Sequence, residues 1–374
     1  MNSAERHTLR YQRRKQKRLN RKVRYDFDTV FSYENLYKSY KKCRKGVAWK
    51  SSTQRYITQA PLLVHRTFIA LHNGTFKSNG FYEFDISERG KVRHIKSVSI
   101  GERVVQKCLC DYALVPVLSK KLIYDNGASL KNKGYHFTIR RLVCHLQKYC
   151  RKHGREGYIL LYDFSKFFDS ISHELCKKII RDNFEDERIV RLAKHFIDAF
   201  DGDKGLGLGS QISQILALSS VNGLDHFIKE KLHIKCYGHY MDDGYLIHRS
   251  KEFLRHCLNE ILKICKELGI NLNVKKTQIV KLSHGFSFIK TRFFVSDSMK
   301  IIRKINRSSI ARERHKLKAY ASKLESKVMT RQEIGNAFQS WIAYANNFNS
   351  WHTKENMKSF YNSLFTQQTN GGSI

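Results

Sequence analysis

Three aspartates at two places in the chain could converge on one site. Asp163 ends the apolar run 158–162, and Asp242 and Asp243 stand side by side within residues 235–248. Clustered carboxylates are the ligands that hold Mg²⁺. Nucleotidyl transfer uses two such ions, one at the attacking hydroxyl and one at the leaving pyrophosphate. A nucleotidyl-transfer site with two Mg²⁺ ions, or Mn²⁺ in their place, therefore requires such a cluster. Taken alone, however, most Asp pairs in turns are solvated and a lone aspartate at a strand end is usually a helix cap, so the context has to decide.

The elements expected around these aspartates suit such a site. The run 158–162 predicts a short strand that leads into an acidic turn and then into a helix from His173 to Ile180. Residues 235–248 alternate around the acidic pair, which predicts a hairpin with the pair at its tip. Asp169 is expected to cap the helix that follows it and to stay outside the metal site.

The rest of the chain divides into helical segments and one further hairpin. Residues 31–71 and 103–122 have helical periods, and strands are expected at 81–86 and 92–98 around a turn at Gly90. After residue 307 the pattern is helical to Phe365, and four aromatic residues are expected to share one core cluster there: Trp341, Tyr344, Phe348 and Trp351.

The charge of the chain indicates a polyanionic partner. Lys and Arg number 69 against 33 Asp and Glu, a net charge of +36, and ten of the basic residues lie between positions 6 and 24. Nucleic acid is the polyanion that best balances such a surface. A basic arm binds phosphate without reading bases, whether it is helical or disordered. We expect phosphate contacts from Arg10, Arg13, Arg14, Lys15 and Arg18.

Other features exclude whole classes of protein. The nine cysteines are an odd number, and Cys108 and Cys110 form the only close pair, so neither a disulfide framework nor a zinc-ligand spacing is present. No apolar run approaches the roughly 20 residues that a membrane span needs. We therefore expect a cytoplasmic protein that is neither secreted nor embedded in a membrane.

At this point the residues resemble a known family. Tyr240-Met241-Asp242-Asp243 looks like the signature of reverse transcriptases, and the stretch from Asp163 to Phe168 looks like their preceding aspartate motif. The resemblance runs from about residue 35 to the C-terminal helices. It is closest to the reverse transcriptases of diversity-generating retroelements and to related bacterial antiphage-defence enzymes.

The resemblance implies an α+β right-hand polymerase. Its fingers and its palm, an antiparallel sheet with helices behind it, would be followed by a C-terminal helical thumb. The segments expected from it are a basic arm at 1–30, fingers with N-terminal helices at 31–157, the catalytic palm at 158–300, and the thumb and tail at 301–374.

The resemblance also implies roles for single residues at the incoming nucleotide. Arg93 and Arg103 become candidate triphosphate clamps, with exposed ion pairs as the alternative. Phe168 stands at the aromatic gate that excludes a ribose 2′-hydroxyl. Lys276 matches the lysine that approaches the leaving pyrophosphate as a general acid or electrostatic clamp. Lys133 belongs to a loop, 126–134, that would position the template and contact nucleic acid.

The segment 205–214 resembles the family's segment beneath the templating base pair, and it departs from the common pattern. Gly209 and Gln211 match nucleotide-binding positions, but Gly207 replaces the usual proline. Leu208 stands where retroviral and intron enzymes have a glutamine. The enzymes of diversity-generating retroelements also have an aliphatic residue at this position. The loss of that polar contact implies lowered fidelity.

Together these features predict an RNA-directed DNA polymerase of a bacterial or phage retroelement or antiviral defence system. Its partners would be an RNA template, such as a dedicated noncoding RNA, a DNA or RNA primer and dNTPs, with an accessory protein or an oligomer allowed. Two alternatives stay open, an RNA-templated RNA polymerase and a maturase-like RNA-binding scaffold without catalysis.

Overall fold

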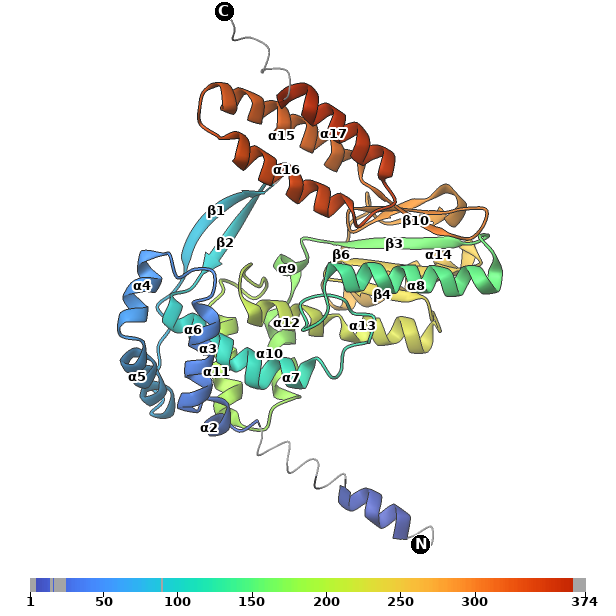
Figure 1. Cartoon of the computed structure of the whole chain (residues 1–374). Helices are drawn as coiled ribbons and strands as arrows, with labels where there is room; N and C mark the ends of the chain where they lie inside the picture. Colours follow the sequence, from blue (N-terminus) through green and yellow to red (C-terminus); the bar gives the residue numbers. More distant parts are fainter. Residues whose placement is uncertain (1–4, 14–15, 17–24, 89, 366–374) are drawn as a thin grey trace, which may run out of the picture.

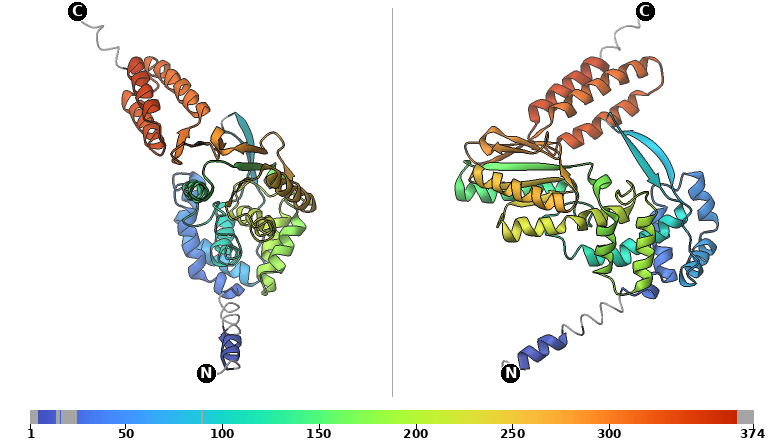
Figure 2. Two further views of the ribbon diagram at one scale, coloured as in Figure 1. Left: turned by 90° about the vertical axis from the view of Figure 1, so that its right-hand side faces the viewer. Right: turned by 180° about the vertical axis from the view of Figure 1, so that it is seen from behind.

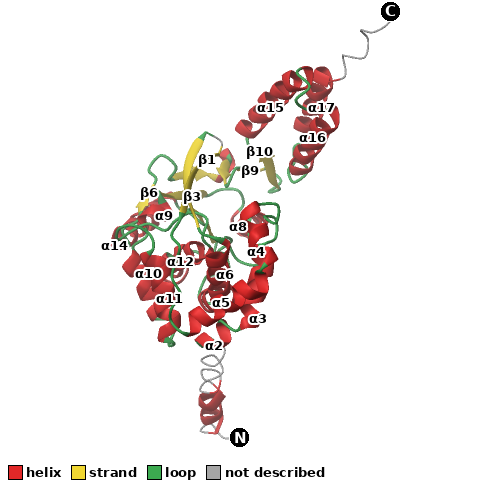
Figure 3. Ribbon diagram, turned by 90° about the vertical axis from the view of Figure 1, so that its left-hand side faces the viewer, coloured by secondary structure: helices red, strands yellow, loops and turns green. Residues whose placement is uncertain are grey.

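The computed structural model describes residues 5–13, 16, 25–88 and 90–365. Figure 1 shows three parts: a helical N-terminal part that carries a two-stranded ribbon, a central sheet, and three C-terminal helices. Helices dominate the two outer parts, and most strands lie between them (Figure 3). No helix within the described ranges is long and apolar enough to cross a membrane.

The central sheet is antiparallel and is built around one strand. β3 (Tyr158–Ser165) pairs with β5 (Asp243–His248), with β6 (Asn271–Leu272) and with β7 (Gln278–Lys281), and β4 (Tyr237–Tyr240) continues the sheet beyond β5. The strand and the hairpin expected from the sequence are thus confirmed.

The unbroken apolar run in β3 has a structural reason. Leu160 and Tyr162 lie in one hydrophobic cluster, whereas Ile159 and Leu161 lie in another, so the strand is buried on both faces. α14 (Lys251–Glu267) contributes to the first cluster and α8 (Tyr135–His153) to the second. The expected antiparallel sheet with helices packed on it is confirmed.

Helices of the first cluster join the sheet to the N-terminal part. They include α12 (Gln211–Ser220), α10 (His173–Arg181), α11 (Glu187–Asp198) and α13 (Asn222–His226), with a π-helical turn η2 (Phe227–Lys231) behind the last. The short α9 (Phe167–Ser170) follows β3 directly.

The N-terminal part packs around α6, and the ribbon projects from it. Its elements are α2 (Phe27–Val30), α3 (Tyr33–Cys43), α4 (Ser51–Thr58), α5 (Ala60–His72), β1 (Tyr82–Glu88), β2 (Lys91–Ser97), α6 (Ile100–Leu109), η1 (Cys110–Leu114) and α7 (Val115–Leu118). The helix expected at 103–122 is interrupted by the π-helical η1. Pro116 explains the break, because it has no N–H to donate and its ring would meet the carbonyl of residue 112.

The C-terminal helices have a core of their own and project from the central sheet (Figure 2), with Asn349 and Ser350 bonded to β10. They are α15 (Arg307–Glu325), α16 (Arg331–Ala345) and α17 (Trp351–Phe365). Trp341 and Phe348 are buried in this core and Tyr344 packs against it, but Trp351 is 63% exposed at the start of α17. The expectation that all four aromatic residues share one cluster was therefore wrong for Trp351.

Two elements lie across the segment boundaries expected from the sequence. α8 precedes residue 158 but packs on the central sheet, not on the N-terminal helices. A second antiparallel sheet contains β8 (Phe286–Phe288), β9 (Thr291–Val295) and β10 (Ile301–Ile305), and β10 pairs with β9 across the expected boundary at residue 300. The short 3₁₀ helix η3 (Leu282–His284) leads into this sheet.

Candidate active site

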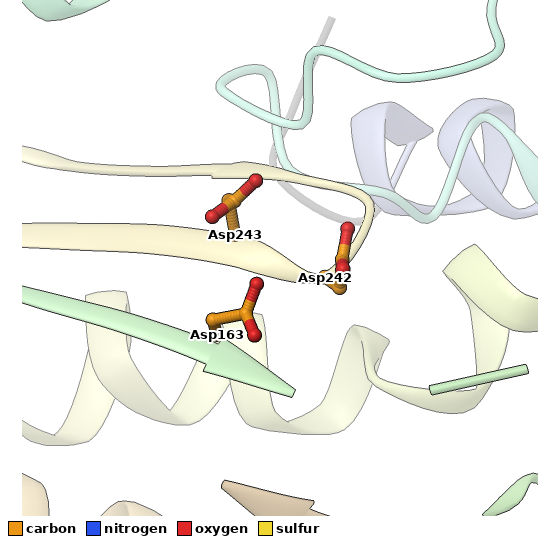
Figure 4. Close-up of side chains that lie close together, drawn as sticks. All are labelled: Asp163, Asp242 and Asp243. Carbon is orange, nitrogen blue, oxygen red and sulfur yellow. The ribbon is translucent and has the colours of Figure 1, made fainter. Parts of the chain in front are cut away.

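Three carboxylates converge at the end of β3. Asp163 lies opposite Asp243 in the β3–β5 register, and Asp242 occupies the turn between β4 and β5. The Phe164 N–H donates to the Asp242 carbonyl over 2.9 Å, which ties the turn to β3. One carboxylate oxygen from each aspartate lies within 4.8 Å of the others. Figure 4 shows the three side chains pointing into one small space.

The electrostatics of this cluster fit divalent cations. Burial raises the pKa of Asp243 to about 7, with the charges of Asp242 and Asp163 adding to the effect. Burial, followed by the charge of Asp163, also raises the pKa of Asp242. Burial and mutual repulsion disfavour ionisation of these carboxylates, and bound cations would relieve the repulsion. An all-oxygen donor set of this kind matches the preference of Mg²⁺ and Mn²⁺.

Lys276 brings a cation to the same place. Its Nζ donates to Asp163 Oδ1 over 2.7 Å, and its side chain is 53% exposed. The turn that carries it is fixed to β3, because the Asn273 N–H donates to the Asp163 carbonyl over 2.7 Å. Partial burial opposes the charged form, but the bond to Asp163 prevails and the pKa of Lys276 is raised. The ammonium is therefore held charged at the carboxylate cluster.

An open cavity of about 590 Å³ lies between β2 and the segment that precedes α12. Arg93 and Leu208 both line it, as do Lys166 and Asp169 just beyond Asp163 in the chain. Phe168 lies between those two residues in sequence, and its carbonyl accepts the Leu206 N–H over 2.9 Å. The cavity therefore gathers basic, apolar and aromatic groups beyond the carboxylate cluster.

Comparison with known proteins gives this arrangement a family. The family described as "Reverse transcriptase (RNA-dependent DNA polymerase)" matches residues 81–324, well over half of the 374-residue chain. This chain belongs to the reverse transcriptase family. The right-hand polymerase fold expected from the sequence is thereby confirmed.

The relatives of this reverse transcriptase are distant. Protein YkfC of Escherichia coli K12 is 23% identical over 244 residues, a match that covers 54% of this chain and 63% of YkfC. Among solved structures, telomerase from Candida albicans bound to a fragment of telomeric RNA has a TM-score of 0.48 at 11% identity, over 78% of this chain and 61% of that one. Apo telomerase from Candida tropicalis has a TM-score of 0.46 at 14% identity, over 60% and 48%.

One departure of this chain from the family pattern has a local explanation. A side-chain carbon at Gly207 would lie 2.3 Å from Cε1 of Phe200, so the ring of Phe200 fills the space that a proline would take. Gly209 keeps the expected glycine at a φ of +105°, close to Ile95 of β2.

Three other residues have contacts that differ from those expected from the sequence. Arg103 donates from a guanidinium nitrogen to the hydroxyl of Ser97 over 2.8 Å and does not line the cavity. Gln211 faces α6, where its amide oxygen accepts from Lys107 over 3.0 Å. The sequence suggested that Asp169 caps the helix that follows it, but Asp169 does not cap α10. The hydroxyl of Ser172 does so, by accepting the Leu175 N–H.

The expected nucleic-acid contacts fall in two regions. Lys133 Nζ donates to the carbonyls of Tyr124 and Asn126 over 2.8 and 2.9 Å, so in this structure its ammonium closes its own loop. Burial lowers its pKa. Arg10 and Arg13 lie exposed on a helix at residues 5–13. The remaining expected contacts lie outside the described residues: Arg14, Lys15 and Arg18.

Sequence reasoning missed several groups at the site. The sequence placed Lys166 in the aspartate motif but did not indicate that it lines the cavity. Its left-handed φ of +46° turns the chain at this point. Lys96 and Asp201 form an ion pair at 2.5 Å and both line the cavity, so they join β2 to the loop before Gly205. Nothing in the residue spacing signals this pair, because its members lie far apart in the sequence.

Proposed function

We propose that this chain is an RNA-directed DNA polymerase that copies an RNA template by two-metal-ion nucleotidyl transfer. The observation that carries the proposal is the convergence of Asp163, Asp242 and Asp243 in a chain of the reverse transcriptase family. A catalytically idle RNA-binding scaffold has no physical need for three mutually repelling carboxylates in one small space.

The chain's residues divide the work of the reaction. Asp163, Asp242 and Asp243 would hold two Mg²⁺ ions, which supply activation of the primer 3′-hydroxyl and neutralisation of the leaving pyrophosphate. Lys276 is a charged proton donor beside this cluster and would protonate or clamp the pyrophosphate. The Lys276 ammonium would have to leave Asp163 to take that role, because it is bonded to this carboxylate in the structure.

The cavity lined by Arg93, Lys166 and Leu208 suits an incoming dNTP. Arg93 on β2 lines this cavity and would bind phosphate oxygens. Phe168, whose carbonyl is bonded to Leu206 of the cavity wall, would lie near the sugar. Leu208 lines the same cavity and offers no hydrogen bond to the nucleotide. We also propose the division into arm, fingers, palm and thumb, with α8 counted as part of the palm.

We further propose a bacterial or phage retroelement or antiviral defence role in the cytoplasm. All nine cysteines are free thiols, which suits a reducing compartment. Sequencing the nucleic acid that copurifies with the protein tests the setting. Copies of a defined noncoding RNA support defence, adenine-mutated copies of a local repeat support diversification, and random cellular RNA supports neither.

The basic arm gives a prediction about salt dependence. Deletion of residues 1–24 removes ten basic residues. Each lost phosphate contact is expected to flatten the slope of log affinity against log salt by about 0.7 to 0.9. RNA affinity is measured by titration at several salt concentrations for the full chain and the truncated chain. An unchanged slope would show that this arm does not touch phosphate.

Leu208 gives a prediction about fidelity. Leu208→Gln restores a polar contact to the incoming nucleotide, and one hydrogen bond corresponds to a roughly 2- to 10-fold change in discrimination. Misincorporation opposite template adenine is expected to fall by that factor. The error spectra of both enzymes are compared by sequencing products made on one RNA template. Identical spectra would remove the low-fidelity claim.

A further inference from the structure

A buried histidine lies behind the catalytic turn. His239 is on β4, three residues before Asp242, and it is 0% exposed. One ring nitrogen, Nε2, bonds to the carbonyl of Met241, and the other, Nδ1, lies 3.3 Å from Oδ2 of Asp225. Asp225 comes from α13, on a different element, and it is also 0% exposed. The ring therefore connects the helical layer to the turn that carries two of the three carboxylates.

Both partners of the ring are acceptors. A neutral imidazole carries one N–H, so donation to a carbonyl and to a carboxylate at once requires the doubly protonated ring. Burial opposes this form, yet Asp225 outweighs burial and the pKa of His239 is raised. A buried pair of opposite charges with hydrogen bonds on both sides holds one geometry, because breaking it leaves a charge unpaired.

The surroundings fix both members of the pair. The Tyr237 hydroxyl donates to Oδ1 of Asp225 over 2.5 Å and lies 2.8 Å from the Tyr162 hydroxyl. The His239 backbone is bonded on both sides to the 125–127 loop, with N–H to the Asp125 carbonyl over 3.1 Å and carbonyl to the Gly127 N–H over 2.9 Å. The imidazole therefore has little freedom to turn.

The turn itself has a shape that needs support. Met241 has a φ of +55°, a left-handed conformation that is uncommon for a residue with a side chain. The Met241 carbonyl belongs to the same peptide plane as the Asp242 N–H, so fixing that carbonyl fixes the start of the Asp242 residue. This contact is the structural link between His239 and a metal ligand.

We propose that His239, held by Asp225, is a positioning residue that orients the Met241–Asp242 peptide and so sets the geometry of the metal site. The inference rests on the proposed two-metal function. Groups behind metal ligands typically change metal affinity or activity by about 10- to 100-fold when they are replaced. The expected signature is a raised metal requirement with little change in nucleotide binding, because His239 does not line the nucleotide cavity.

The test compares three variants of the full chain by primer extension over a range of Mg²⁺ concentrations. For His239→Leu, which has no side-chain donor for the Met241 carbonyl, the Mg²⁺ concentration at half-maximal rate is expected to rise by at least about tenfold, with kcat reduced and the KM for dNTP within about twofold. Asp225→Asn is expected to fall between this variant and wild type, since a neutral imidazole can still donate to the Met241 carbonyl. Tyr237→Phe removes a hydroxyl that donates to Asp225 but leaves the bond between His239 and Met241, so its rise is expected to be smaller than that of the His239 variant.

Thermal melting and RNA affinity accompany each variant, so that loss of folding is separated from loss of positioning. A wild-type metal requirement in folded His239→Leu would overturn the inference. So would an equal rise in Tyr237→Phe, because the effect would then come from general disturbance of the buried network. An inactive wild-type enzyme would instead reject the proposed polymerase function. Differences between active variants test only the role of His239.

Discussion

Asp163→Asn and Asp242→Asn are each expected to abolish DNA synthesis, with a rate loss of at least about 1,000-fold. Each change keeps the size of the side chain and removes one charged ligand from a cluster whose oxygens lie within 4.8 Å of one another. Metal-ion catalysis supplies several kcal/mol of transition-state stabilisation, and each 1.36 kcal/mol corresponds to about tenfold in rate. Single-turnover primer extension measures the loss directly.

RNA binding separates this effect from misfolding. The basic surface is untouched by either variant, so RNA affinity at fixed salt is expected to stay within about twofold of wild type. Asp182→Asn is a suitable control, because Asp182 is an exposed residue at the end of α10 with no part in the cluster. Wild-type incorporation by either cluster variant would refute the assignment of these aspartates as metal ligands.

Phe168→Ala or Phe168→Val is expected to admit ribonucleotides. Phe168 is half-buried and lies in the sequence between Lys166 and Asp169, which line the cavity, and its carbonyl accepts the N–H of Leu206, which also lines it. A ring beneath the sugar leaves no volume for a 2′-hydroxyl, whereas a smaller side chain opens that space. The steric effect is a few kcal/mol, so the preference for dNTP over rNTP is expected to fall by about a hundredfold or more.

Single-nucleotide extension with dNTP and with rNTP, on one RNA template and primer, measures this preference for all three enzymes. Phe168 also contacts the ring of Phe167 at a centroid distance of 5.7 Å. The valine variant keeps more of this packing than the alanine variant and so controls for its loss. Unchanged selectivity in both variants would mean that Phe168 is only a core aromatic residue.

The strand and the hairpin that carry the three aspartates were predicted correctly from the sequence. The apolar run before Asp163 and the alternation around Asp242 are short-range patterns, and the structure has a strand and a hairpin at those positions. The pairing that brings the two together is long-range. It was expected from the family resemblance, because neither segment alone specifies its partner.

Side-chain direction was the part that the sequence did not reveal. Arg103 and Gln211 occupy the expected elements, but their bonds to Ser97 and Lys107 depend on how α6 packs against its neighbours. Lys133 was expected to contact nucleic acid, and in the structure it closes its own loop. His239 looked like an ordinary strand residue, because its acidic partner comes from a helix fourteen residues earlier.

The most direct test of the central claim is product identity with the wild-type enzyme. Purified protein is given a primed RNA template, Mg²⁺, and equal concentrations of dNTPs and rNTPs, and the products are digested with DNase or with alkali. The account predicts template-complementary DNA that resists alkali and disappears when Mg²⁺ is chelated. Alkali-sensitive product would identify an RNA polymerase, and no product with a well-folded enzyme on several primed RNAs would contradict a polymerase function.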